Sequence, residues 1–118
     1  MKTHKDLDVW KKSIDLVTVV YIITERLPKE EIYGLTSQIR RCSVSIPSNI
    51  AEGSARQGKK EFIYFLYIAL GSIAELETQL IIAEKLKYLT PENNRSVLPK
   101  VEEIRKMLVG LIKFVKSR

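Results

Sequence analysis

The chain has 118 residues, of which 45% are hydrophobic and 29% are charged, so it can bury one core and is too apolar for the disordered class. Its one cysteine, Cys42, excludes an internal disulfide and suits a reducing compartment. The net charge of +6 divides into +4 over residues 1–60, −3 over residues 61–94 and +5 over residues 95–118, which suits either a polyanionic partner or a lysine excess that maintains solubility.

The first predicted helix runs from about Leu7 to Leu27, with Asp6 as its N-cap and Pro28 as its stop. Apolar residues recur along it at spacings of three and four, which is typical of a packed bundle seam. We expect this seam to consist of Leu7, Trp10, Ile14, Val17, Tyr21 and Thr24. A second apolar stripe beside it consists of Val9, Leu16, Val20, Ile23 and Leu27.

The second predicted helix starts after residues 28–31 and ends near Gly53, which suits a left-handed C-terminal cap. Pro47 lies inside this helix and should kink it without ending it, because proline removes one backbone hydrogen bond. The predicted core positions are Leu35, Ile39, Cys42, Ile46 and Ile50. A polar stripe consists of Gln38, Arg41, Ser45, Ser48 and Glu52, with Asn49 between it and the core.

The third predicted helix, about Lys59–Leu89, is apolar on every side. Its heptad seam consists of Phe62, Leu66, Ala69, Ile73, Leu76, Leu80 and Ala83. Two further apolar faces consist of Ile63, Tyr67, Leu70, Ala74 and Ile81, and of Phe65, Ile68 and Ile82. Each helix of a four-helix bundle should keep one face in water, so the extra apolar surface needs a partner, and a second subunit is the simplest one.

The fourth predicted helix begins between Pro91 and Leu98, with Thr90 as N-cap if Pro91 takes the first position, or with Pro99 in the first turn. Its seam consists of Val97, Val101, Ile104, Leu108, Leu111 and Val115. No segment has the pattern of a strand. Four amphipathic helices with short connections predict an all-α, up-and-down, antiparallel, left-handed four-helix bundle, with residues 1–118 as a single domain.

Residue types that usually carry chemistry are scarce, so we expect no enzyme activity, cofactor or metal site. His4 is the only histidine and is expected in a frayed tail, which excludes a core histidine triad and the Glu-x-x-His pairs of di-iron bundles. Cys42 falls on an apolar helix face and is expected to be a buried structural thiol. Glu75 is expected to pair with Arg40 or Arg41 from a neighbouring helix or subunit.

The chain is expected to be cytoplasmic, without a membrane partner. Its longest run without charge, Phe62–Ala74, has thirteen residues and is too short to span a bilayer. The N-terminal residues contain no apolar signal core.

Two stretches resemble the signature of a known family. These are Leu-Thr-Ser-Gln-Ile-Arg-Arg-Cys-Ser-Val-Ser-Ile-Pro-Ser-Asn-Ile-Ala-Glu-Gly at residues 35–53 and Ala-Leu-Gly-Ser-Ile-Ala-Glu-Leu-Glu-Thr-Gln-Leu at residues 69–80. They are similar to bacterial four-helix-bundle proteins encoded in intervening sequences of 23S rRNA. Asp-Leu-Asp-Val-Trp-Lys at residues 6–11 also fits, so the resemblance covers about residues 6–115. The matched positions are Gln38, Arg40, Arg41, Ser45, Pro47, Asn49, Glu52, Gly53, Ser72 and Glu75.

The resemblance has limited implications for function. The family is similar to the accessory protein of diversity-generating retroelements, a pentameric barrel that binds nucleic acid through a basic surface. The resemblance therefore implies a pentamer. It implies no established catalytic residues, so the matched positions are expected to serve folding and assembly.

The leading hypothesis is a non-catalytic, pentameric protein that binds RNA or DNA. The candidate contact residues are Arg40, Arg41, Arg56, Lys59, Lys60, Arg105, Lys106 and Lys113. The candidate subunit-interface residues are Ile63, Tyr67, Ile68, Leu70, Ala74, Val44 and Pro47. The alternative is a protein–protein scaffold with no nucleic-acid role, whose partner would be a protein such as a reverse transcriptase or a ribosomal factor.

Overall fold

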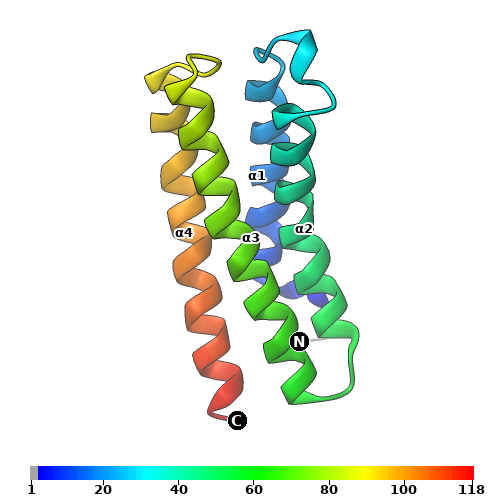
Figure 1. The fold of residues 1–118 in the computed structure, drawn as a ribbon. Helices are drawn as coiled ribbons and strands as arrows, with labels where there is room; N and C mark the ends of the chain where they lie inside the picture. Colours follow the sequence, from blue (N-terminus) through cyan, green and yellow to red (C-terminus); the bar gives the residue numbers. More distant parts are fainter. Residues whose placement is uncertain (1–2) are drawn as a thin grey trace.

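Four long helices run up and down along a common axis and are joined by short connections (Figure 1). This computed structural model describes residues 3–118; residues 1 and 2, part of the segment predicted to lack a signal core, lie outside the described residues. The helices are α1 (Asp8–Thr24), α2 (Leu35–Ala55), α3 (Lys59–Lys85) and α4 (Pro91–Lys116). Two short 3₁₀ helices, η1 (His4–Asp6) and η2 (Lys29–Glu31), precede α1 and α2. The all-α, up-and-down four-helix bundle predicted from the sequence is confirmed.

The core lies between the four helices along the length of the bundle. Each helix packs against the next in the chain, and α4 packs against α1. Over residues 3–118 the two diagonal pairs, α1 with α3 and α2 with α4, make no close backbone contact. The largest fully buried side chains are Leu16, Val20, Ile39, Ile46, Ile50, Leu66, Ile73, Leu76, Leu80, Leu89, Ile104 and Leu108. Burial confirms the seams predicted for the second and third helices, although Leu35 and Phe62 at their ends are only half-buried.

α1 turns the second of its two apolar stripes toward the core. The buried side chains are Val9, Leu16, Val20, Ile23 and Leu27. In the predicted seam only Thr24 is buried, while Ile14 and Tyr21 are 40% and 41% exposed, so that prediction is wrong. Both stripes have a helical period, and spacing alone therefore does not decide which one faces the core.

The start of α1 also differs from the prediction. Asp6 is not the N-cap of α1: it lies in η1, where its carboxylate accepts a hydrogen bond from the Thr3 N–H (3.1 Å). α1 begins at Asp8, after Leu7, with no side-chain cap. His4 is not frayed, because it is half-buried in η1 with its ring edge-on to Trp10 and 5.1 Å between the ring centroids.

Gly53 lies inside α2, which continues to Ala55, so the predicted left-handed cap is wrong. A Cβ at Gly53 would lie 2.7 Å from the Cβ of Phe65 and 3.1 Å from Cδ1 of Phe62. α2 and α3 therefore approach too closely for a side chain at this position. Glycine is required here by packing and not by backbone conformation.

α3 ends at Lys85, before the predicted Leu89, in a turn that contains a left-handed residue. Lys87 has φ 65°, a region that favours glycine. The Tyr88 N–H donates to the Ala83 carbonyl (2.9 Å), which closes the end of the helix.

α4 begins as the earlier of the two predicted alternatives. Thr90 is the N-cap, Pro91 is the first residue, and Thr90 and Asn93 form a reciprocal capping box. The alternative with Pro99 in the first turn is wrong, because Pro99 lies well inside the helix. The predicted seam is buried except that Ile112 replaces Leu111 in the core.

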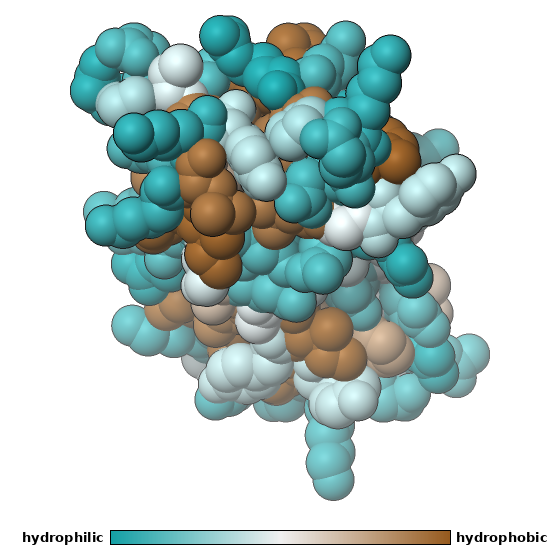
Figure 2. Space-filling model, turned by 45° about the horizontal axis from the view of Figure 1, so that its top comes forward, coloured by the Kyte–Doolittle hydropathy of each residue, from teal (hydrophilic) through white to brown (hydrophobic). Residues whose placement is uncertain are grey.

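α3 exposes apolar side chains outside the core. Tyr64, Tyr67, Ile81 and Ile82 are between 42% and 61% exposed. Figure 2 shows that exposed apolar surface on one face of the molecule forms separate patches among hydrophilic side chains. Among the described helices α3 alone is long and apolar enough to cross a membrane, a property that it shares with core helices of soluble proteins. Its heptad seam lies in the bundle core.

Candidate functional site

Cations gather where α2 turns into α3 and where α4 finishes. We call residues 52–61 and 113–118 the basic end; they contain six Lys/Arg and two Glu. The opposite end, residues 25–31 and 84–95, contains five Lys/Arg and five Glu, and we call it the balanced end. The up-and-down topology brings the two parts of each end together (Figure 1). At the basic end the contact is direct, because the Lys59 ammonium donates to the backbone carbonyls of Lys116 and Arg118.

Lys59 and Lys60 stand in the first turn of α3, where the helix dipole disfavours cations by about 0.3–1 kcal/mol each at low ionic strength. The N-cap, Gly58, provides no side chain to the free N–H groups of this turn. Within residues 3–118 the Lys60 ammonium has no ion-pair partner. Glu61 in the same turn offsets part of this cost, and a bound anion such as a phosphate would offset more of it.

Exposed aromatic rings lie among these cations. Tyr64 is 61% exposed and Phe114 is 59% exposed. Lys116 donates to the Tyr67 hydroxyl (2.8 Å) and lies over its ring, 5.1 Å from the centroid. Arg118 lies 5.5 Å from the centroid of the Phe114 ring. Tyr64, Tyr67 and Phe114 are therefore partly available to solvent close to the basic end.

Half of the predicted nucleic-acid contacts meet at the basic end: Arg56, Lys59, Lys60 and Lys113. Arg56 is neutralised locally, because it pairs with Glu52 (2.8 Å) and Glu61 (3.7 Å). Lys60 and Lys113 are exposed and have no ion-pair partner in the described part of the chain.

The other predicted contacts lie away from this end. Arg40 is half-buried, and its Nε donates to a hydroxyl on α1 (2.9 Å). Arg105 forms two hydrogen bonds with the Glu102 carboxylate (2.6 and 2.8 Å). Arg41 lines a groove between α2 and α3, and Lys106 is exposed on α4. The structure therefore does not bring the eight candidates into one surface.

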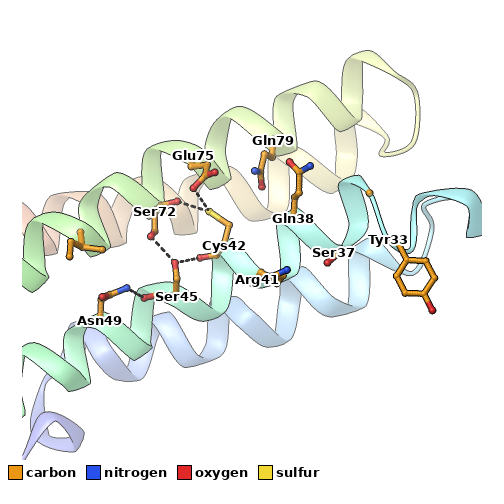
Figure 3. Close-up of a pocket in the computed structure, with 12 residues that line it drawn as sticks. Tyr33, Ser37, Gln38, Arg41, Cys42, Ser45, Asn49, Ser72, Glu75 and Gln79 are labelled. Atoms are coloured by element: carbon orange, nitrogen blue, oxygen red, sulfur yellow. Dashed lines mark hydrogen bonds between the residues drawn. The ribbon is translucent and has the colours of Figure 1, made fainter.

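The groove between α2 and α3 is polar and has a volume of about 620 Å³, within the range of roughly 300–1,000 Å³ typical of small-ligand sites (Figure 3). Its lining residues are Tyr33, Gly34, Ser37, Gln38, Arg41, Cys42, Ser45, Asn49, Ile68, Ser72, Glu75 and Gln79. Six of the ten positions that carry the family resemblance are among them. Within residues 3–118 no three His, Cys, Asp or Glu side chains come together as a possible metal site.

Hydrogen bonds fix the middle of this groove. The Ser45 hydroxyl donates to the Cys42 carbonyl (2.7 Å) and shares a hydrogen bond with the Ser72 hydroxyl (2.6 Å). The Cys42 thiol donates to the Ser72 carbonyl (3.0 Å) and to Oε1 of Glu75 (3.6 Å). The Asn49 amide donates to the Ser45 carbonyl (2.7 Å). These side-chain hydrogen bonds join α2 to α3, and the Cys42 thiol beneath Glu75 in Figure 3 helps to hold its carboxylate in place.

Burial, followed by the charge and the hydrogen bond of Glu75, raises the pKa of the Cys42 thiol to about 12. The thiol therefore stays protonated at neutral pH and acts as a donor, which confirms the predicted buried structural role. Within one chain the predicted pairing of Glu75 with Arg40 or Arg41 is wrong, because the recorded partner of Glu75 in residues 3–118 is this thiol.

Gln79 lies one helical turn beyond Glu75 on the same side of α3. It is only 7% exposed, and within the described residues its Oε1 has no hydrogen-bond partner. Leaving a buried acceptor unpaired costs about 1–3 kcal/mol. Gln38 extends from the facing helix without a hydrogen bond to it (Figure 3). The α3 wall therefore carries two acceptors in a row, a carboxylate and an unpaired amide oxygen.

The predicted interface residues fall on two surfaces. Val44 and Pro47 line an apolar hollow of about 380 Å³ between α1 and α2, together with Trp10, Ile14 and Val17. The other five lie on α3, where Tyr67 and Ala74 are exposed, Ile63 and Leu70 are half-buried against the core, and Ile68 lines the polar groove.

Sequence reasoning missed two parts of these sites. Lys116 and Arg118 belong to the basic end, and the predicted topology could have placed them beside the α2–α3 loop. Gln79 belongs to the groove, but its position beside the third-helix seam gave no signal that it would be buried without a partner.

Comparisons with known proteins agree with this architecture. Residues 5–110 match the model of a family described as 23S rRNA-intervening sequence protein. The chain is also similar to a protein with unknown function from the S23 ribosomal protein family of Bacteroides thetaiotaomicron, for which there is a crystal structure. The two sequences are 30% identical, and the structures match with a TM-score of 0.82 over 89% of this chain and 98% of that chain. No curated protein matches the chain.

Proposed function

The chain belongs to the 23S rRNA-intervening sequence protein family, and from that premise we propose that it is a non-catalytic homopentamer that binds single-stranded RNA or DNA at its basic end. The observation that carries this proposal is the arrangement of cations at that end. Six Lys/Arg face two Glu there, whereas the opposite end is balanced. We place its action in the cytoplasm, because its only cysteine is a free thiol.

The details of the basic end favour a phosphate backbone as the ligand. Lys59 and Lys60 lie at the N-terminus of α3, where N–H groups and the helix dipole favour anions. Lys113 and Lys116 lie in the last turn of α4, where the dipole favours cations, so neither destabilises that helix. Lys113 is exposed, whereas Lys116 contacts Tyr67.

The exposed rings favour single strands over duplexes. Tyr64, Tyr67 and Phe114 stand beside the cations with between 47% and 61% of their surface exposed. Unpaired bases stack on such rings, whereas the bases of a duplex are already stacked on each other. Proteins that bind single strands without sequence preference usually combine cations with exposed aromatic rings in this way.

The apolar surfaces support assembly into a ring. The hollow between α1 and α2 and the exposed apolar side of α3 are different surfaces on different helices. When two unlike surfaces pair between copies, the contact is head-to-tail, and repeated contacts close into a ring if the rotation allows. The number five rests on the family resemblance. In a ring whose axis follows the helices, all basic ends would share one rim.

Binding would be tested with single-stranded and duplex oligonucleotides at about 50 and 200 mM salt. We expect single strands to bind more tightly, and log affinity to fall linearly with log salt because bound phosphates release counterions. No binding at the lower salt would overturn the nucleic-acid proposal and favour a protein scaffold. Tight binding without a salt effect would place the contact away from the cations.

Assembly would be tested by light scattering on the parent chain and on Val44→Glu and Ile81→Glu, which alter side chains that are 38% and 42% exposed. We expect the parent to have five times the 13.6 kDa chain mass and each variant to dissociate. Helical content measured by circular dichroism controls for folding. A monomeric parent would contradict the ring.

A further inference from the structure

We infer that the groove between α2 and α3 binds a guanine base. The base has two possible sources, a bound strand and a free nucleotide. The inference rests on the proposed function only for the bound strand. The groove is separate from the basic end, because none of the residues that line it belongs to that end.

The groove needs a ligand that donates hydrogen bonds toward α3. Glu75 presents an exposed carboxylate whose one recorded hydrogen bond within residues 3–118 comes from the Cys42 thiol (3.6 Å). Gln79 presents a buried Oε1 that has no partner within residues 3–118. These two residues lie one turn apart on α3 and line the same groove. Two neighbouring N–H groups on a flat ligand would reach both once the buried Gln79 amide turns toward the groove.

The groove also needs a ligand that accepts hydrogen bonds toward α2. Arg41 lines that wall, and in the described part of the chain its guanidinium has no ion-pair partner. Guanidinium binds bidentately to paired acceptors such as O6 and N7 of guanine. Gln38 and Asn49 add amide groups on the same wall.

Among the common bases only guanine meets both requirements. Its Watson–Crick edge carries two adjacent donors, N1–H and the N2 amino group, which match a carboxylate and an amide oxygen. Its other edge carries O6 and N7, which match Arg41. Adenine, cytosine and uracil each place a ring or carbonyl acceptor beside their donor, and this acceptor would face the Glu75 carboxylate.

The alternative occupants fit less well. A simple cation would be attracted to Glu75 but repelled by Arg41, and a simple anion would meet the reverse. An apolar side chain from a second copy would leave Oε1 of Gln79 unpaired. The thiol does not offer covalent chemistry, because it is held protonated between Ser72 and Glu75.

The test is calorimetric titration of the full chain with GMP, AMP, CMP and UMP. The shared phosphate cancels in this comparison, so selectivity reports the base. We expect GMP to bind at least tenfold more tightly than the others. Glu75→Gln and Arg41→Met should each lower GMP affinity at least tenfold, and Glu77→Gln, on the α3–α4 side, is the matched control.

Gln79→Met keeps the length of the side chain and removes the unpaired oxygen, so it tests the site without a risk of unfolding. We expect equal or higher thermal stability together with at least fivefold weaker GMP binding. Equal affinity for the four nucleotides, no binding at all, or GMP binding unchanged in Glu75→Gln and Gln79→Met would each overturn the inference.

Oligonucleotides separate this inference from the proposed function. If GMP binds and no oligonucleotide does, the guanine site stands and the strand-binding function fails. If strands bind at the basic end with no preference for guanine and GMP does not bind, the groove inference fails and the proposed function stands. If a strand that contains guanine outcompetes one without it, and Glu75→Gln removes that preference, the base comes from the strand.

Discussion

At the balanced end, carboxylates equal cations in number and side chains bind the backbone of their own chain, whereas at the basic end six cations outnumber two carboxylates. Glu31 illustrates the first case, because its carboxylate accepts from the Leu35 N–H at the start of α2 (2.9 Å) and from the Tyr88 hydroxyl (3.1 Å). That hydrogen bond also raises the pKa of Tyr88. Lys60 illustrates the second case, because it stands exposed at a helix N-terminus where it is disfavoured.

Stability and the proposed binding should therefore depend on side chains at opposite ends of the bundle. Caps and internal pairs hold the balanced end together, and each contributes to folding. The basic end is held by a close approach of two helices, by the core and by the contact of Lys59 with the carbonyls of Lys116 and Arg118. Lys60 and Lys113 have no ion-pair partner within residues 3–118 and should contribute little to folding. Substitutions at the two ends should therefore separate stability from affinity.

The largest expected effect concerns the close approach that leads into the basic end. Gly53→Ala should lower the free energy of unfolding by about 2–3 kcal/mol, because the new Cβ would lie 2.7 Å from that of Phe65. Gly110→Ala is the matched control, since a Cβ there meets nothing within 4 Å, and it should stabilise the helix by about 0.5–1 kcal/mol. Chemical denaturation measures both. Equal effects would show that the close approach is not needed.

The next effect should fall on affinity alone. The double variant Lys60→Gln/Lys113→Gln should weaken single-strand binding about 25-fold at 0.1 M salt and make the salt slope shallower by about 1.4, as expected for two lost phosphate contacts. Its unfolding free energy should be nearly unchanged, because the gain from removing Lys60 at a helix N-terminus offsets the loss of Lys113 from the last turn of α4.

The matched control for that variant is Lys29→Gln/Lys85→Gln at the balanced end, which changes the net charge by the same amount. If both doubles weaken binding equally, only net charge matters and the distinction between the ends is lost. Fluorescence anisotropy at several salt concentrations distinguishes the two results.

A smaller effect is expected at the balanced end. Thr90→Ala removes the side-chain acceptor for the Asn93 N–H (3.1 Å) and should cost about 1 kcal/mol of stability. Affinity for single strands should not change. A parallel loss of affinity would mean that the two ends are coupled through α4.

The smallest effect should be a gain. Lys87→Gly relieves a left-handed backbone at φ 65° and should raise stability by about 0.5 kcal/mol, after the greater freedom of glycine in the unfolded chain is subtracted. The melting temperature reports it. A lower melting temperature would show that the Lys87 side chain contributes more than its backbone conformation costs.

The sequence predicts an element well where its residue pattern is compatible with only one structure. The seam of α3 and the capping box at Thr90 follow from local spacing and are present. The seam of α1 was mistaken because its two stripes have the same period, and tertiary packing selects between them. Gly53 was mistaken because a cap and a close approach both call for glycine.

The candidate sites were harder to predict because they depend on neighbours. The polar stripe of α2 is visible in the sequence, but the groove exists only because Ser72, Glu75 and Gln79 of α3 face it. Likewise, four of the predicted basic residues meet at one end, while Arg40 is occupied by a hydroxyl of α1 that no helical period reveals. The pairing of Arg105 with Glu102, three residues away on α4, is one that helical spacing could have indicated.

The even number of helices brings η1 and the last turn of α4 to the same end of the bundle, beside the α2–α3 loop (Figure 1). An affinity tag or fluorophore fused to either terminus would therefore crowd the basic end and distort a binding measurement. A circular permutant avoids this: a short linker joins the old termini, and the chain is reopened in the turn at residues 86–90. In that form both new termini, and any surface tether, lie one bundle length away from the cations.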